Sequence, residues 1–481
     1  IGSPDNQKLD EDFAKTPEFR WLGKHAARFG FHRAFPRRSA KRRLHFTQIV
    51  ALVALGVGLF WALRTSPAVT FGALHAGALA LFTIAILWRL AAAASLAPVK
   101  SRLALPPTWP TYTILCPLYH EANVVSGLVA AIERLDYPRH ALDVKLLIEG
   151  DDPDTLAAAL AAAGAAHIEV IIVPATAPRT KPKALNAGLL RARGDYVVVY
   201  DAEDRPHPQQ LRAALGAFED GGERLACVQA PLVIDNADAS WIARQFAAEY
   251  AIQFREILPL LARLDLPLPL GGSSNHFRTD ALTTVGGWDS FNVTEDADLG
   301  YRFAREGFHA GVIAHPTWEE APVTFGAWLG QRTRWIKGHM QTWAVLMRNP
   351  FRTAREMGLG AFASMQLVLA GGIVATFAHG PLACIVLIAA LSPYDLLGPA
   401  DFTLALFGYS VAAFAAVTAS ALSGSLSHIR AALTMPFYWP LSSLAAARAL
   451  FEFAFRPHHW AKTAHGVSIR AKAPTPAPLS P

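Results

Sequence analysis

Five stretches of this 481-residue chain are long, apolar and almost free of charge, and they restrict its fold more than any other feature. They cover residues 45–63, 69–88, 361–391, 402–422 and 432–449. About 20 apolar residues in a helix are enough to cross the hydrocarbon core of a bilayer. Only 17% of the chain is charged, against roughly 25% in soluble domains. We therefore expect a membrane protein. A buried helical hairpin could explain the first pair, but two such lengths in tandem disfavour it.

Basic residues beside the apolar stretches predict an orientation in the membrane. A basic run occupies residues 33–43, just before the first stretch, and Lys100 and Arg102 follow the second. Because positive charge marks the cytoplasmic ends of membrane helices, residues 1–43 and the region after residue 97 are expected in the cytoplasm. Nucleic acid is not an expected partner, since no basic-aromatic binding module accompanies the run. The chain opens on Ile1 rather than Met, so we expect it to be a fragment of a longer protein.

Between the second and third stretches, short apolar runs alternate with helical patterns. The runs 112–118, 144–148, 169–173 and 196–200 are typical of buried strands, and 124–135, 154–164 and 183–192 of helices. This order predicts a Rossmann-like, mixed but mainly parallel sheet. Ligands of such sheets bind at the carboxyl ends of the strands.

Acidic residues follow three of the four predicted strands. Glu121 comes after the first strand, Glu149-Gly150-Asp151-Asp152 after the second, and the sequence Asp-Ala-Glu-Asp at 201–204 after the fourth. Any one of them could simply cap a helix. Carboxylates that meet at one edge repel each other unless a cation lies between them. Mg²⁺ or Mn²⁺ binds such oxygens and bridges to substrate phosphates, so the pattern predicts a metal-bound diphosphate.

A basic run at residues 179–183 adjoins the predicted helix 183–192. Its cations and the positive end of the helix dipole suit a diphosphate. Solvated loop lysines explain the run equally well when it is considered alone.

Residues 324–357 combine an apolar stripe with aromatic and basic side chains. On a helix, Gln331, Arg334 and Trp335 share one face, and together they suit a site that stacks a ring and binds an anion. A helix at the membrane interface has this composition. Core packing explains the apolar stripe equally well, but it does not explain the polar groups in this cluster.

Six sequence blocks in order resemble the inverting family-2 glycosyltransferases. They are Pro117…Glu121, Asp151-Asp152, Lys183…Asn186, Asp201-x-Glu203, Thr294-Glu295-Asp296 and Gln331-Arg332-x-Arg334-Trp335. Within that family, the chain is most similar to the membrane-embedded processive branch of cellulose, chitin, hyaluronan and poly-N-acetylglucosamine synthases. It resembles above all the bacterial exopolysaccharide glycosyltransferases of the XagB type. The resemblance extends over about residues 40–470.

The resemblance implies a GT-A fold that binds a UDP-sugar and a divalent metal ion, Mg²⁺ or Mn²⁺. Asp201 and Glu203 would bind the metal, with Asp204 as a further ligand, because Glu203 stands where the family more often has Asp. The implied nucleotide-sugar site consists of Pro117, Tyr119, Glu121, Asp151, Asp152, Lys183, Asn186, Asp201 and Glu203.

The resemblance also implies catalytic roles. Asp296 would be the general base that takes the proton of the acceptor hydroxyl, with Glu295 and Asp201 in the same catalytic set. Capping of the helix that begins after Thr294 is the alternative explanation of Glu295. The implied acceptor and diphosphate contacts are Gly272, Ser273, Gln331, Arg332, Arg334 and Trp335.

These expectations describe an α/β GT-A domain inserted between transmembrane α-helices of a bacterial inner membrane. The predicted order is a basic segment (1–43), two transmembrane helices (44–97), the glycosyltransferase domain (98–323), interface helices (324–357), C-terminal transmembrane or interfacial helices (358–455) and a cytoplasmic tail (456–481). Because a basic tail on the cytoplasmic side needs an even number of spans, we expect residues 361–391 to form two short elements.

The expected activity is the processive polymerisation of a sugar, glucose or N-acetylglucosamine, from its UDP-sugar into an exopolysaccharide that passes through the membrane. Single transfer to a lipid carrier is the rival among enzymes. An inactive membrane scaffold or transporter is the rival from another class. The linkage, the acceptor and any accessory export proteins are left open.

Overall fold

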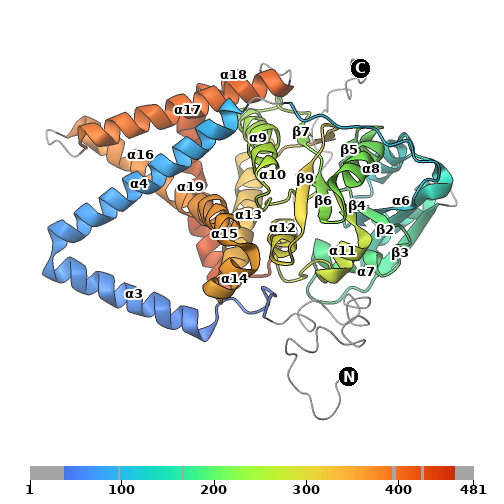
Figure 1. Cartoon of the computed structure of the whole chain (residues 1–481), viewed down its shortest axis with the longest axis horizontal. Helices are drawn as coiled ribbons and strands as arrows, with labels where there is room; N and C mark the ends of the chain where they lie inside the picture. The colour runs from blue at the N-terminus through green and yellow to red at the C-terminus, as the bar shows by residue number, and fades with distance from the viewer. Residues whose placement is uncertain (1–36, 96–97, 165–166, 393–396, 424–426, 461–481) are drawn as a thin grey trace, which may run out of the picture.

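A seven-stranded sheet forms the centre of the domain that lies, in the sequence, between the second and third apolar stretches (Figure 1). The structure, a computed structural model, describes residues 37–95, 98–164, 167–392, 397–423 and 427–460. The strand order is β3-β2-β1-β4-β8-β6-β9. The strands are β1 (Tyr112–Leu118), β2 (Leu142–Glu149), β3 (Ile168–Val173), β4 (Tyr196–Val199), β6 (Leu225–Gln229), β8 (Asn275–Arg278) and β9 (His309–Val312).

The pairing confirms the predicted mixed, mainly parallel sheet. Strands β3, β2, β1 and β4 are parallel neighbours, and β6 pairs with β9 in parallel. Strand β8 runs antiparallel between β4 and β6. The four predicted strands are β1 to β4, and β2 continues one residue past its predicted end, to Glu149.

Side chains of the central strands supply two hydrophobic cores, one on each face of the sheet. Successive residues of a strand point to opposite faces, so Leu115 and Val199 enter one core whereas Ile114 and Val198 enter the other. Each fully buried side chain of this kind stabilises the fold by about 1.5–3 kcal/mol. The surrounding helices are α5 (Val125–Ile132), α6 (Pro153–Ala162), α7 (Lys181–Leu189), α8 (Gln210–Gly221) and α11 (Thr279–Thr284), and the short η2 (Arg139–Ala141) precedes β2.

A small second sheet lies beside the loop that follows β4. Its order is β5-β10-β7, from β5 (Arg205–Pro206), β10 (Thr317–Glu319) and β7 (Leu232–Ile234). Because β10 pairs with β5, the acidic end of β10 is close to residues 201–204. The sequence contains no signal for this pairing, since β5 has only two residues.

Two groups of helices connect the sheets to the apolar part of the chain. The first is α9 (Trp241–Ile252), the π-helical turn η3 (Gln253–Ile257) and α10 (Leu258–Arg263). The second is α12 (Glu295–Arg305), α13 (Phe325–Leu346) and α14 (Pro350–Met357). Helix α13 carries the predicted interface motif in a single 22-residue helix that packs against α12 and α19.

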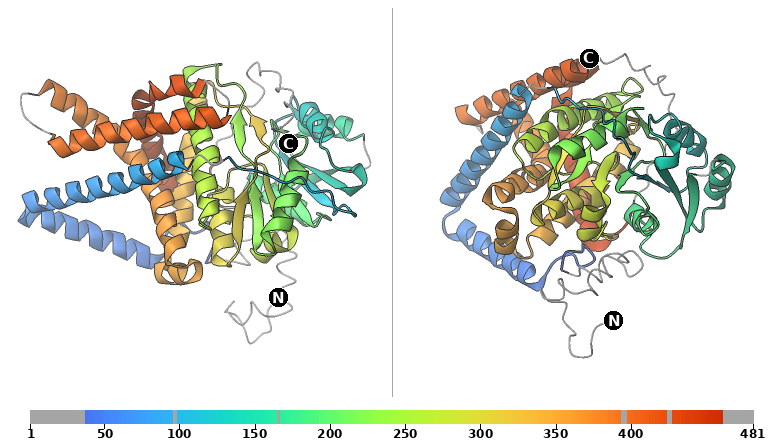
Figure 2. Two further views of the ribbon diagram at one scale, coloured as in Figure 1. Left: turned by 45° about the horizontal axis from the view of Figure 1, so that its top comes forward. Right: turned by 45° about the vertical axis from the view of Figure 1, so that its right-hand side comes forward.

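Four helices in the described part of the chain are long and apolar enough to cross a membrane. They are α3 (Phe46–Thr65), α4 (Pro67–Ala94), the stretch Leu359–Leu391, and α17 (Pro399–Ser423). They lie on one side of the sheet domain, where α3 and α4 form a V that extends away from it (Figures 1 and 2). No residue of α3 is buried, and exposed apolar surface of this extent is typical of a membrane-contacting face.

The structure corrects two expectations about the C-terminal helices. Residues 361–391 do not form two elements, because α15 (Leu359–Met365), η4 (Gln366–Ala370) and α16 (Gly371–Leu391) form one helical stretch. The expected span at 432–449 falls in α19 (Met435–Phe455), which follows α18 (Ser427–Ala432), packs against α13 and α16, and is not one of the four candidates. The four candidate spans are therefore not the set that the sequence predicted.

A hydroxyl from α19 explains why Pro381 does not break α16. Proline has no N–H, so it leaves the carbonyl of the residue four positions earlier without its helical partner. The hydroxyl of Ser443 lies 3.2 Å from the Phe377 oxygen and 2.6 Å from the Thr376 oxygen, and it accepts the Gly380 N–H at 2.8 Å. The helix continues because its neighbour satisfies the freed groups.

Helix α13 can approach α12 closely because residue 338 is glycine. A Cβ at Gly338 would lie 2.4 Å from Oγ1 and 2.8 Å from Cβ of Thr294, the residue that precedes α12. We expect Gly338→Ala to destabilise the protein by about 1–3 kcal/mol through this overpacking, and to lower the apparent melting temperature of the purified protein in detergent. The matched control is Gly326→Ala on the same helix, where a Cβ meets nothing within 4 Å. Equal melting temperatures of the two variants would contradict the packing argument.

Candidate active site

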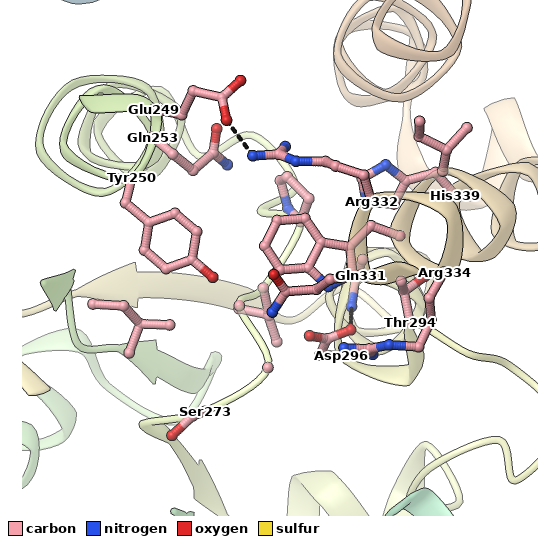
Figure 3. A pocket seen from close by; sticks show the side chains of 18 of the residues that line it. Glu249, Tyr250, Gln253, Ser273, Thr294, Asp296, Gln331, Arg332, Arg334 and His339 are labelled. Atoms are coloured by element: carbon pink, nitrogen blue, oxygen red, sulfur yellow. Dashed lines mark hydrogen bonds and ion pairs between the residues drawn. The ribbon is translucent and has the colours of Figure 1, made fainter. Parts of the chain in front are cut away.

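A cavity of about 920 Å³ lies at the carboxyl ends of β1 and β4 and extends to side chains of α4, α16 and α19. Segments distant in the sequence meet in its wall, among them α9, α12 and α13 (Figure 3). Most of the site residues predicted from the sequence line it. They are Pro117, Tyr119, Glu121, Asp201, Glu203, Gly272, Ser273, Glu295, Asp296, Gln331, Arg332, Arg334 and Trp335.

Five other predicted residues do not line the cavity. One of them, Asp204, belongs to the acidic group described below, and the other four have structural partners. Asp152 caps α6 by accepting the Thr155 N–H at 3.2 Å and also accepts the His120 N–H. The buried amide of Asn186 donates to the Trp288 oxygen at 2.6 Å. The other two lie in ion pairs, Asp151 with Arg179 at 2.5 Å and Lys183 with Glu149 at 2.8 Å.

Two neighbouring residues that the resemblance did not assign to the donor site occupy the corresponding places in the wall. Glu149 is the last residue of β2 and lines the cavity. Lys181 also lines the cavity. The Lys181 Nζ lies 2.5 Å from Oδ1 of Asp201 and 2.5 Å from the Gly272 oxygen. The helix predicted from residue 183 begins at Lys181. Because positions i and i+2 of a helix point about 200° apart, only one of Lys181 and Lys183 can face the cavity.

Carboxylates from two strands gather near the loop after β4. Asp204 accepts the Asp201 N–H at 2.7 Å and the hydroxyl of Ser273. Burial and the charge of Asp201 raise the pKa of Asp204 well above its usual range. Burial and the charge of Asp204 do the same to the pKa of Glu319, which comes from β10 and which the sequence analysis missed.

This acidic group fits a divalent cation that completes its shell with substrate oxygens. Within the described residues, no three His, Cys, Asp or Glu side chains form a ready metal site. Asp201 and Glu203 nevertheless line the cavity, and Oδ1 of Asp204 is buried without a hydrogen-bond partner. Mg²⁺ and Mn²⁺ sites often use one or two protein carboxylates together with substrate phosphates.

The predicted base lies in the first turn of α12 and lines the same cavity as this group. Thr294 occupies the N-cap position, although its side chain makes no capping hydrogen bond. A Cβ at Gly272 would lie 3.3 Å from Oδ2 of Asp296, so glycine permits the close approach of this loop. Burial and the charge of Asp296 raise the pKa of Glu295 to about 8. Burial also raises the pKa of Asp296, whereas the charges of Lys181 and Arg334 lower it.

The motif on α13 divides between two environments. Gln331, Arg334 and Asp296 point toward one another in Figure 3, while Arg332 points toward Glu249 of α9. The charges of Glu295, Asp296 and Asp201 raise the pKa of Arg334, although its burial lowers that pKa below the usual range.

The segment after α19 returns to the cavity, which the sequence analysis did not anticipate. Its last described residue, Trp460, lies 4.5 Å from the guanidinium carbon of Arg334, with its ring facing that group. Lys337 and Gln341 hold this segment through the carbonyl oxygens of His459 at 2.7 Å and Pro457 at 2.8 Å. Residues 457–460 therefore lie beside the sheet domain.

Two family descriptions match the chain. "Glycosyl transferase family 2" matches residues 113–278, which contain β1 to β8. "Glycosyl transferase family group 2" matches residues 196–422, which continue through α13 into the apolar helices.

Curated relatives are distant and include enzymes with different products. The beta-monoglucosyldiacylglycerol synthase of Synechocystis sp. is 26% identical over 270 residues, which are 54% of this chain and 55% of the relative. Cellulose synthase 1 of Komagataeibacter xylinus is 26% identical over 262 residues, which are 52% of this chain and 16% of the relative. The chain spans little more than half the length of the first relatives that it matches.

A solved structure has the same fold. The mannosyltransferase PcManGT from Pyrobaculum calidifontis, in complex with GDP-Man and Mn²⁺, matches with a TM-score of 0.53 and 20% identity. The match covers 79% of this chain and 97% of that one. It confirms the predicted GT-A-like fold with a mostly parallel sheet. Two family-2 glycosyltransferase descriptions that together span residues 113–422 therefore place this part of the chain among the family-2 glycosyltransferases.

Proposed function

We propose that the protein is a processive, inverting β-glycosyltransferase that builds a polysaccharide from a UDP-sugar and passes it into the membrane. One observation carries the proposal. The cavity that holds the predicted donor and base residues continues, past the motif on α13, to side chains of the membrane-length helices α4 and α16 and of α19. A growing chain in this cavity would thus lie next to the apolar helices. The proposed setting is a bacterial inner membrane with the sheet domain in the cytoplasm.

The donor diphosphate would lie between the carboxylates after β4 and the cations of the cavity. Asp201 and Glu203 would hold Mg²⁺ or Mn²⁺, which neutralises charge on the departing nucleoside diphosphate. Lys181 and Arg334 would pair with the diphosphate oxygens. Glu121 and Glu149 at the ends of β1 and β2 would lie at the nucleoside. PcManGT, whose structure contains a nucleotide sugar and Mn²⁺, supports a donor and a metal of these classes.

Asp296 is the proposed general base. Its carboxylate takes the proton of the acceptor hydroxyl as that oxygen bonds to the anomeric carbon, and the bond from this carbon to the nucleoside diphosphate breaks. Attack opposite the leaving group inverts the anomeric configuration. Because the pKa of Glu295 is about 8, Glu295 keeps its proton at neutral pH and leaves Asp296 as the carboxylate of the pair.

Single transfer to a lipid is a second candidate, and the composition of the wall favours it. On the membrane side the cavity is lined by Ile257 of η3, by Leu367 and Val368 of η4, and by Gly371 and Gly372 of α16. Such an apolar wall would suit an acyl chain. A relative named as a lipid glucosyltransferase supports the same candidate. Product length distinguishes the two candidates, since a lipid acceptor receives one sugar and a polymerase many.

Asp296→Asn tests the base and the activity together. We expect sugar incorporation to fall by a factor of about 10²–10⁴, the usual contribution of a general base, while the affinity for UDP stays unchanged. The measurement is incorporation from a panel of radiolabelled UDP-sugars with Mg²⁺ or Mn²⁺ by the purified protein in detergent, with products separated by size. Polymer synthesis by the variant at the unaltered rate would show that another group is the base.

Lys181 and Lys183 form a matched pair for the donor site. We expect Lys181→Gln to weaken UDP binding by about tenfold or more, the size of a lost charge-assisted hydrogen bond. Lys183→Gln should have a smaller effect on UDP binding, because Lys183 does not line the cavity and would reach the donor only through its ion pair with Glu149. Calorimetric titration of both variants with UDP and Mn²⁺ decides between them. A larger loss of UDP affinity in the Lys183 variant would show that Lys183, the residue selected from the sequence, binds the diphosphate.

The pH dependence should report the raised pKa of Asp296. The base acts as a carboxylate, so protonation abolishes activity as the pH falls through its pKa. Burial raises that pKa above the usual 3.8, so kcat/KM should begin to fall at a higher pH than an exposed aspartate would give. UDP binding over the same pH range is the control for loss of the donor. Constant activity down to about pH 4, the ordinary pKa of Asp, would contradict the assignment.

A further inference from the structure

The guanidinium of Arg332 is held by side chains from two other helices. It pairs with the carboxylate of Glu249 on α9 and lies 3.3 Å from the hydroxyl of Tyr438 on α19. That hydroxyl also donates to Glu249 at 2.9 Å and accepts the indole N–H of Trp328 at 2.7 Å. Three elements, α9, α13 and α19, are therefore joined at one point in the cavity wall, and Figure 3 shows the pair of Glu249 and Arg332.

The same guanidinium covers the indole of Trp335. Its central carbon lies 4.9 Å from the centre of that ring. The phenol of Tyr250 stacks on Trp335 with ring centres 6.1 Å apart and 26° between the planes, and Phe246 lies 5.5 Å away. The indole is thus fixed by one cation and two rings from α9, and it still lines the cavity.

The two arginines of the motif face different partners. The carboxylates whose charges raise the pKa of Arg334 are Glu295, Asp296 and Asp201, which belong to the proposed base and donor sites. The carboxylate that acts on Arg332 is Glu249. The sequence analysis assigned both arginines to the acceptor or the diphosphate, but the contacts of Arg332 tie it to the orientation of Trp335.

We propose that Glu249 is a positioning residue, which through Arg332 holds Trp335 in the orientation that presents the acceptor sugar to Asp296. The proposal rests on the proposed function, because it requires a sugar acceptor beside Trp335. Tyr438 links the pair of Glu249 and Arg332 to α19. The position of Trp335 therefore also depends on α19, which packs beside the apolar helices. On the other side Tyr250 bonds to Glu319, next to the proposed metal ligands.

The physical consequence of losing Glu249 is a misplaced acceptor. Without its partner, the buried Arg332 cation must find other acceptors or water, since a buried unpaired charge is costly. Its guanidinium then leaves the indole, and Trp335 can turn. The donor contacts do not involve Glu249, so the UDP-sugar should still bind. A bound donor with a misplaced acceptor is open to attack by water.

The test compares two products of one reaction. Purified protein receives radiolabelled UDP-sugar and Mn²⁺, and both released UDP and incorporated sugar are measured. Coupled transfer releases one UDP for each sugar incorporated. In Glu249→Gln we expect incorporation to fall by about tenfold or more, as small misplacements of a reactant do, while UDP release falls less. The ratio of UDP released to sugar incorporated should rise several-fold, and UDP affinity should stay within about twofold.

Matched variants separate positioning from stability. Glu356→Gln on α14 breaks ion pairs with Arg305 of α12 and with Arg352. Glu356 does not line the cavity, so the ratio of this variant should equal that of the wild type. Tyr438→Phe keeps the ring and removes only the hydroxyl, so it should raise the ratio by less than Glu249→Gln does. It also serves if the Glu249 variant does not fold.

A double variant tests whether Glu249 acts through Arg332. If it does, Glu249→Gln combined with Arg332→Gln should give the ratio of Arg332→Gln alone, because the two changes remove one interaction. Additive effects would overturn the positioning role in favour of direct contact with the acceptor. An unchanged ratio in Glu249→Gln, with both activities reduced equally, would also overturn it. A wild-type protein that incorporates no sugar from any donor would instead overturn the proposed function.

Discussion

Carboxylates from three separate segments meet in one cavity, and the arrangement depends on the cations between them. Asp201 and Glu203 come from the loop after β4, Glu319 from β10, and Glu295 and Asp296 from α12. Such a group cannot be buried at neutral pH unless cations or protons compensate its charge. The balance uses both, since one ammonium group bonds to Asp201 while Glu295 retains its proton.

Lys181 links the two acidic groups. It lies against Asp201 on one side, and the charges of Glu295 and Asp296 also act on it. Burial lowers its pKa, but these carboxylates raise it above the usual value for lysine, so the group stays charged. A donor diphosphate would bring further negative charge to this point. Lys181 therefore stabilises the carboxylates of the folded site and is also placed to pair with the donor diphosphate.

The sequence predicted the sheet and most of the cavity because both follow from local patterns. Strand periodicity indicates where a parallel strand ends, and the fold brings such ends together, so Glu121 and Asp201 were found. Glu149 and Lys181 lie in the predicted acidic strand end and basic run, but the resemblance selected their neighbours Asp151, Asp152 and Lys183. Which member of each run faces the cavity depends on where β2 ends and α7 begins. Glu319 could not be found, since the pairing of β10 with β5 leaves no local pattern. The ion pair of Glu249 with Arg332 joins residues 83 positions apart.

Helix α13 explains why the chemistry and the apolar helices cannot be separated in this chain. Its residue Gly338 packs against Thr294 at the start of α12, and its residue Arg334 faces Asp296. One turn of helix away, Lys337 bonds to Glu452 of α19 at 2.8 Å. A displacement of α19 must therefore move either this buried ion pair or α13 itself. Protein interiors are close-packed and deform little. A product that displaced α16 or α19 would therefore also shift α13 and, with it, the surroundings of Asp296. Under the proposed function, sugar addition and product movement would both depend on the position of this one helix.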